Sequence, residues 1–202
     1  MAFLITLNEV YSAILHSWAL FRGDRGALAA FDSSYDGFWR SFMVILVLAP
    51  FYVIVFMAEQ RMILTDPAGA PAAFSTGAFL FWKSVSALVD WIAFPILMAA
   101  LARPLNFSNR YALLIVGRNW TSILAILPFA VVSLLFGIGL LPPGGLLVMS
   151  LLLMIVMLRF RYQVFSAALG GPTSLVIGFV ALDFLFSFLI GVVINRLTGI
   201  VG

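Results

Sequence analysis

Apolar residues fall into five long runs along this chain, separated by short segments that carry polar residues, proline or glycine. The runs lie at residues 41–58, 79–101, 120–141, 144–165 and 175–195. Each is close to the roughly 20 residues with which an α-helix crosses the hydrocarbon core of a bilayer. The pattern therefore predicts an all-α, polytopic membrane protein with five transmembrane helices.

Composition agrees with the pattern, because 64% of the residues are hydrophobic and only 9% are charged. Those values lie far outside the range of soluble globular domains. With five spans in 202 residues, little chain remains for a second folded unit. We therefore predict two regions, an amphipathic cytoplasmic region at 1–40 and a five-helix transmembrane domain at 41–202.

Before the first run, large apolar residues recur at helical spacing: Phe3, Leu7, Val10, Tyr11, Ile14, Leu15, Trp18 and Phe21. Such a stripe is typical of an amphipathic helix that lies in the membrane interface, where Trp18 suits the headgroup level. The glycine-containing segment 23–26 ends it with a turn. The alternative is a helix packed against the cytoplasmic ends of the bundle.

The arginines indicate an orientation, because cytoplasmic segments are enriched in Lys and Arg. With the N-terminus inside, eight arginines fall on or near the cytoplasmic side: Arg22, Arg25, Arg40, Arg103, Arg110, Arg118, Arg159 and Arg161. Arg61, Lys83 and Arg196 fall toward the other side. The 66–71 loop, a turn at 142–145 and the 198–202 tail are then external. Ten arginines against one lysine, with abundant Ala, Gly and Leu, indicate a GC-rich bacterial genome. We therefore expect the protein in the cytoplasmic (inner) membrane of a bacterium.

Several side chains are expected to anchor the helices at the headgroups. These interfacial anchors are Trp18, Trp39, Arg40, Arg159 and Arg161. Trp belongs at the membrane–water boundary, and long arginine side chains can reach it from a buried backbone position.

Polar side chains inside the spans are the candidates for a site. They are Lys83, Asp90, Arg118, Asp183, Ser187 and Asn195. An ionisable group at the bilayer centre costs about 2.5–3.5 kcal/mol on insertion scales, so each needs a partner, a water path or a function. Asp183, Ser187 and Asn195 recur on one face of the fifth span and must face protein or water.

Arg118 and Lys83 are the predicted partners of the two aspartates, Asp90 and Asp183. Arg118 can reach them if the third helix runs long and kinks at Pro128. If 111–119 instead lies along the interface, Arg118 anchors at the headgroups. A partnered aspartate would lock the helix register, whereas an accessible one would suit proton or ion coupling.

The chain carries no catalytic or cofactor motif that we can identify, and it has one histidine and no cysteine. We therefore predict a protein that is not an enzyme and that uses no cofactor or metal. Its basic residues are scattered, which argues against nucleic-acid binding. The expected partners are the lipid bilayer and either another protein or further copies of the chain.

The segment before the first span carries Tyr35, Gly37, Phe38 and Trp39. Together with five spans and an inside N-terminus, these residues resemble the Ypt-interacting-protein (Yip) membrane family, whose members often carry an Asp-x-Tyr-Gly-Pro-Phe-Trp-like sequence there. Asp36 separates the Tyr from the Gly, and the proline is missing. The resemblance implies a non-enzymatic membrane organiser or accessory subunit. The alternative is a small oligomeric transporter or channel that uses Asp90 and Asp183.

Overall fold

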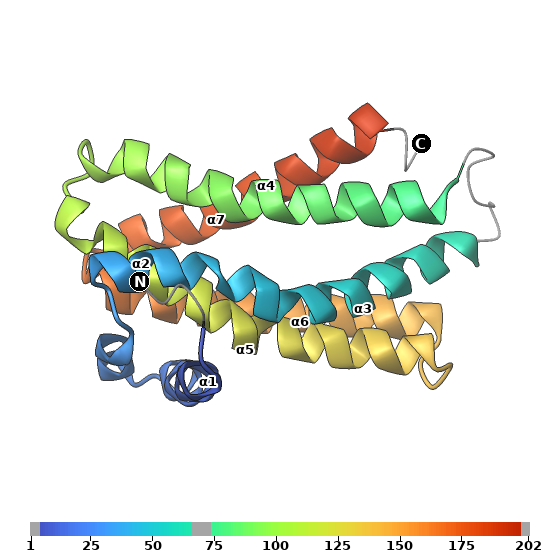
Figure 1. Cartoon of the computed structure of the whole chain (residues 1–202), viewed down its shortest axis with the longest axis horizontal. Helices are drawn as coiled ribbons and strands as arrows, with labels where there is room; N and C mark the ends of the chain where they lie inside the picture. The colour runs from blue at the N-terminus through green and yellow to red at the C-terminus, as the bar shows by residue number, and fades with distance from the viewer. Residues whose placement is uncertain (1–4, 66–73, 199–202) are drawn as a thin grey trace.

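The computed structural model describes residues 5–65 and 74–198, and these residues form a helical bundle (Figure 1). Its elements are α1 (Leu7–Phe21), η1 (Arg25–Ala30), α2 (Tyr35–Phe42), α3 (Val44–Leu64), α4 (Thr76–Ala102), η2 (Ser108–Arg110), α5 (Tyr111–Gly137), α6 (Pro143–Leu169) and α7 (Thr173–Thr198). Here η1 and η2 are short 3₁₀ helices. Predictions about Phe3, the 66–71 loop and the 199–202 tail concern residues outside the described ones.

Five helical stretches are long and apolar enough to cross a membrane, which confirms the predicted fold class. They are Tyr35–Leu64, Thr76–Ala102, Ser108–Gly137, Pro143–Leu169 and Thr173–Arg196. α5 lies at the centre and packs against α3 and α6, while α4 and α7 pair on the other side of the bundle (Figure 1). α5 therefore carries the largest share of the buried side chains.

The third span is one long helix, so residues 111–119 belong to it and do not form a separate interfacial segment. α5 runs without a break from Tyr111 to Gly137, with Pro128 inside it. Hydropathy places its start too late because Arg118 and Asn119 interrupt the apolar run, yet both are fully or nearly fully buried. Arg118 therefore faces the interior of the bundle.

The segment 142–145 is not the free turn that its prolines and glycines suggested. Pro143 is the first residue of α6, preceded by Pro142 in an extended conformation. Proline is favoured at this position because the amide proton that it lacks would have no helical partner. The chain instead reverses just before it, where Gly139 adopts a positive φ of 83°.

α1 crosses the bundle at its side, and Figure 1 views this helix end-on while the spans lie across the page. A Thr6–Glu9 capping box starts the helix. Ala13, Ser17 and Leu20 are buried against the bundle. The opposite side exposes Leu7, Tyr11, Leu15 and Trp18. If the spans cross a bilayer, α1 thus lies parallel to its plane with an apolar face uncovered by the chain.

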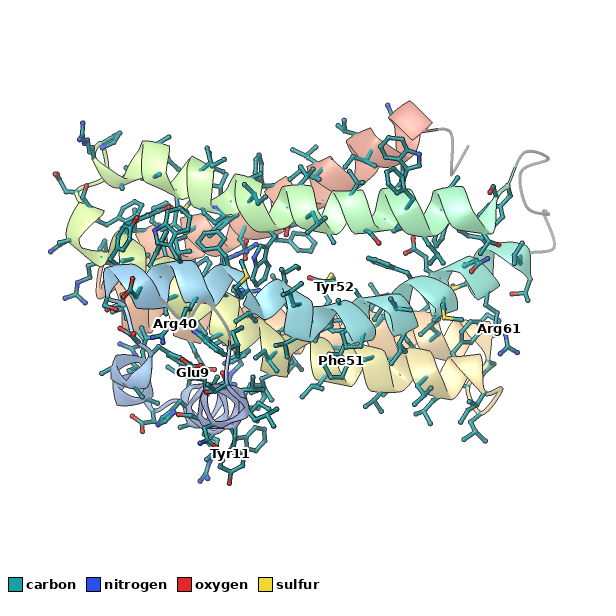
Figure 2. All side chains as sticks on the ribbon, in the orientation of Figure 1. Glu9, Tyr11, Arg40, Phe51, Tyr52 and Arg61 are labelled. Atoms are coloured by element: carbon teal, nitrogen blue, oxygen red, sulfur yellow. The ribbon has the colours of Figure 1, made fainter. Side chains whose placement is uncertain are left out.

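A salt-bridge network joins α1 to the segment before the first span. Ser34 caps α2 by accepting from the amide of Gly37 at 3.2 Å. Arg40 pairs with Asp32 at 2.6 Å and with Glu9 at 3.3 Å. Figure 2 labels Arg40 and Glu9. Arg40 was predicted to anchor at the headgroups, whereas in the structure its guanidinium forms ion pairs with these two carboxylates. We call Glu9, Asp32 and Arg40 the N-terminal latch.

Within the latch, the surroundings of Asp32 lower the pKa of its carboxyl group. Hydrogen bonds from the Ser34 side chain and backbone, followed by the charge of Arg40, hold the pKa of Asp32 below its ordinary value. A lowered pKa means that the ionised latch stabilises the fold at pH values above the unfolded pKa of about 3.9. That stability is lost as the pH falls through the folded pKa.

We expect Gly37→Ala to loosen the start of α2. A Cβ at this position would overlap the backbone carbonyl and the carboxyl group of Asp32. We expect the free energy of unfolding to fall by about 1–3 kcal/mol, as for other overpacked sites. Denaturant titration in detergent micelles, followed by circular dichroism, measures it.

Gly77→Ala is the matched control, because no atom lies within 4 Å of the place that a Cβ would occupy there, in the first turn of α4. Alanine at this position should be neutral or stabilising by up to about 1 kcal/mol. Equal effects of the two substitutions would contradict a close approach at Gly37.

Acidification below about pH 4 should weaken the latch in the natural protein. Asp32→Asn removes the titrating group but keeps an acceptor for the Ser34 amide, so the variant should lose less stability over the same pH range. Thermal unfolding between about pH 5 and pH 3 measures the difference. Asp36→Asn, an exposed acid in the first turn of α2, is the control and should keep the natural pH dependence. A pH dependence of Asp32→Asn that matches the natural protein would refute the latch.

Candidate functional site

Arg118 lies at the centre of a cluster of charged side chains inside the bundle. This residue is 3% exposed. Its Nε and Nη2 atoms donate to Asp183 Oδ1 of α7 at 3.1 and 2.9 Å. Nη2 also contacts Asp90 Oδ2 of α4 at 3.4 Å. The predicted pairing of Arg118 with both aspartates is therefore present, and it joins three spans.

Arg161 of α6 completes the charges. Its Nε lies 3.3 Å from Asp183 Oδ2, and Nη1 donates to the backbone carbonyl of Arg118 at 3.2 Å. Nη2 lies 3.5 Å from Ser122 Oγ. Arg161 was predicted to anchor at the headgroups, and this was wrong, because the side chain turns inward to Asp183. Arg159, two residues earlier, is exposed and lies over the ring of Phe21, and its anchoring at the headgroups stays a prediction.

Ser187 closes the network on α7. Its hydroxyl donates to Asp90 Oδ1 at 2.6 Å, while Asp183 on the same helix contacts the two arginines. We call Asp90, Arg118, Arg161, Asp183 and Ser187 the ion cluster. Its two arginines and two aspartates balance in formal charge, and its members come from α4, α5, α6 and α7.

Buried aromatic rings line one side of the cluster. The guanidinium of Arg118 lies 4.3 Å from the centroid of the Phe94 ring and 6.0 Å from that of Trp91. Phe94 is fully buried. The face of an aromatic ring attracts a cation, and the attraction grows where water is excluded. Arg118 is thus held by carboxylates at its edge and by rings at its face.

Two of the candidate polar residues lie outside the ion cluster. Lys83 was predicted as a partner of the aspartates, but its Nζ pairs with Glu59 of α3 at 2.5 Å. Glu59 was not among the candidates, because it follows the apolar run 41–58. The signal for it would have been an acid directly after the apolar run, at a position where the helix still continues. Asn195 lies about two helical turns beyond Ser187 on α7, toward the C-terminal end of the helix.

A hollow of about 170 Å³ opens beside the ion cluster between α6 and α7. Arg161, Asp183 and Ser187 form its polar side. The rest of the lining is apolar: Phe129, Met154, Met157, Leu158, Val180 and Phe184. The cluster is therefore reached from the lipid-facing side of the bundle at this place. We call this hollow the α6/α7 groove.

A second hollow, of about 190 Å³, lies between α3 and α4. Trp91 Nε1 donates to the carbonyl of Phe42 at 3.2 Å on one side of it, and Lys83 contacts Glu59 on the other. Its walls are apolar except for Tyr52, labelled in Figure 2, and Ser84. This hollow has no charged lining residue, so it has fewer groups than the α6/α7 groove with which to recognise a polar or charged ligand.

The small residues of α7 do not serve close packing within the chain. Around Gly178 and Gly191, no atom lies within 4 Å of the place a side chain would occupy.

Among the described residues, no group of three or more His, Asp or Glu side chains gathers where it could hold a metal ion. The ion cluster is therefore the strongest candidate site, and its chemistry is that of charge pairing.

Comparison with known protein families, with curated proteins and with solved structures finds no match.

Arg118→Gln should strongly destabilise the bundle. Removing the guanidinium leaves Asp183 and Asp90 short of positive charge in a buried setting, which typically costs about 3–5 kcal/mol. Unfolding by denaturant in mixed micelles measures the loss. Arg103→Gln, at an exposed position after α4, should change stability by less than about 0.5 kcal/mol. An Arg118→Gln protein as stable as the control would mean that the cluster does not hold the spans together.

Proposed function

We propose that this protein is a non-enzymatic, Yip-like membrane organiser or accessory subunit of a bacterial cytoplasmic membrane. The observation that carries this is the charge-balanced ion cluster, in which each aspartate contacts Arg118 and has a further partner. A coupling site must release and rebind a proton or ion in each cycle. Carboxylates that share a buried arginine are instead suited to fixing one arrangement of helices.

The surface that would meet a partner lies around the start of the first span. Tyr35 is 77% exposed and Trp39 is 45% exposed, whereas Gly37 is buried. Aromatic side chains of this kind are common in the energetic centres of protein interfaces. The residues that carry the resemblance therefore divide into a buried Gly37, a half-buried Phe38 and two exposed aromatics available for recruitment.

The same end of the bundle carries the arginines that support an inside N-terminus. Arg22, Arg25, Arg103 and Arg110 lie in or beside the loops and short helices there, and all are exposed. The positive-inside rule favours placing this end in the cytoplasm. Because the chain has no cysteine, single cysteines introduced at Arg25 and at Thr65 would report sidedness with a membrane-impermeant thiol reagent.

A small transporter or channel is the second candidate, and one observation favours it. The α6/α7 groove reaches Asp183 and Ser187, and the Asp90 side chain is 25% exposed. Intramembrane acids with access to a cavity are typical of ion and proton pathways. The groove is mainly apolar and opens toward lipid, which is why we rank transport second.

Proton flux into liposomes separates these two functions. We expect purified protein, reconstituted with a pH-sensitive dye inside the vesicles, to give no flux above that of empty vesicles. Flux that Asp90→Asn abolishes and Asp36→Asn preserves would establish transport and refute the organiser. Asp36 is a suitable control because it is an exposed acid outside the ion cluster.

A photo-crosslinking amino acid tests recruitment in cells. Placed at Tyr35, it should give one discrete adduct, because this side chain projects from the proposed recruiting surface. Phe81 is the matched control, a 60% exposed aromatic in α4 away from that surface. Adducts of the same size and yield from both positions would contradict a partner specific to the segment before the first span.

A further inference from the structure

We propose that the uncovered face of α1 is inserted in the membrane leaflet at the arginine-rich end of the bundle, and that it responds to loose packing of those lipids and not to their charge. This face consists of Leu7, Tyr11, Leu15 and Trp18, each half-exposed or more. The inference goes beyond the proposed function, because it concerns lipid and holds for an organiser and for a transporter. It rests on where α1 lies along the spans, on its two flanks and on its charge.

α1 lies beside the spans and not beyond their ends. The ring of Phe21, its last residue, packs edge-on against that of Phe160, with 5.5 Å between the ring centroids. Phe160 lies nine residues before the end of α6 at Leu169, about 13 Å along the helix. Toward the other end of α1, Glu9 pairs with Arg40 of the first span at 3.3 Å. The outward face of α1 therefore meets whatever surrounds the spans at that level, which in a membrane is lipid.

The uncovered face of α1 continues into the outer surface of the first span. A hollow of about 270 Å³ lies between them. Leu7 and Val10 line it from α1, and Met43 and Leu46 line it from the first span. Leu7, Met43 and Leu46 are all exposed. One apolar surface thus runs across both helices, so the acyl chains that cover the span also cover α1.

The two flanks of α1 differ in polarity in the way that an inserted helix requires. Asn8, Ser12 and His16 recur every four residues along one flank. The His16 ring lies edge-on to that of Phe31, the residue after η1, with 6.2 Å between the centroids. Figure 1 shows η1 between α1 and the end of the bundle where α2 begins, so this polar flank is turned toward that end and the lipid headgroups. Val10 lies on the opposite flank, toward the bilayer centre.

The charge of this region makes lipid packing, and not lipid charge, the property to which α1 responds. Residues 5–25 contain two acids and two arginines, so their formal charges cancel. Within α1 the one residue with a formal charge is Glu9, which pairs with Arg40. An interfacial helix binds through apolar burial and through attraction of basic residues to anionic lipids, and α1 has no basic residue for the second. Its insertion therefore depends on how readily the leaflet opens to admit Leu15 and Trp18.

α1 cannot turn this face away from the membrane, because the bundle holds its opposite face. Ala13, Ser17 and Leu20 are buried, and the helix packs chiefly on α5. α1 is thus a fixed wedge in one leaflet of the bilayer. A curved membrane whose outer leaflet contains α1 has more room between its lipids, so the protein should collect there.

Spin-label accessibility tests the insertion. Because the chain has no cysteine, single cysteines at Leu15 and at Asn8 can be labelled in the whole protein, reconstituted in phosphatidylcholine vesicles. We expect the Leu15 label to collide more with oxygen, which concentrates in hydrocarbon, and the Asn8 label more with a water-soluble nickel chelate. Equal exposure of both labels to nickel would place the face in water. Dipolar broadening between Leu15 labels would show that a second copy covers it, and either result would overturn the proposal.

Membrane tubes pulled from giant phosphatidylcholine vesicles test the response to packing. Ala29, exposed in η1, is replaced by cysteine and labelled with a membrane-impermeant dye, which marks only the molecules that have α1 in the outer leaflet. We expect the label to be about threefold denser on the tube than on the flat membrane. Adding phosphatidylglycerol should change that ratio by less than about twofold.

Substitutions of exposed residues separate α1 from the rest of the bundle. The double variant Leu7→Gln/Leu15→Gln should bring the ratio close to one, because it removes apolar side chains that the bundle does not bury. Tyr35→Gln, at an exposed aromatic of the proposed recruiting surface, is the control and should keep the natural ratio. A natural protein spread evenly over tube and vesicle, a ratio governed by phosphatidylglycerol, or an unchanged ratio in the double variant would each overturn the proposal. Crosslinking from Tyr35 reports on recruitment separately, so its failure leaves the wedge standing.

Discussion

A guanidinium buried among transmembrane helices requires negative partners on more than one neighbouring helix, and Arg118 obtains them from α4 and α7. Its contacts with Asp183 and Asp90 hold the α4–α7 side of the bundle against α5. Arg161 adds α6 through the second oxygen of Asp183. Because an isolated charge is so costly in hydrocarbon, this arrangement leaves little freedom in how the four helices rotate about their axes.

The same constraint shapes the surface. Asp183 has to face Arg118 and Arg161, so the polar stripe of α7 turns inward and the apolar side chains beside it line the α6/α7 groove. Arg161 serves the cluster with part of its guanidinium and lines the groove with the rest. A contact that stabilises the fold thereby also brings charged groups to the wall of the groove.

The N-terminal latch is a second polar network of a different kind. Asp32 is half-exposed, in contrast to the nearly buried Asp183, so water screens the latch and its pairs contribute less to stability than those of the ion cluster. Its effect is positional, since it holds α1 beside α2 and leaves Tyr35 and Trp39 uncovered. The exposed Tyr35 and Trp39 are the side chains on which the proposed recruitment of a partner rests.

Hydropathy along the chain determined the class of protein, its five spans and the two aspartates that needed partners. Those features depend on transfer of each residue from water to lipid, which can be read one segment at a time. Hydropathy left the start of the third span open and placed Arg161 at the headgroups. It also suggested the two aspartates as partners of Lys83, which in the structure pairs with Glu59. Which side chains meet depends on the crossing and rotation of helices distant in sequence. Only the tertiary structure brings Arg118, Arg161 and Asp183 together and opens a groove beside them, because no local pattern encodes the distance between residues on different helices.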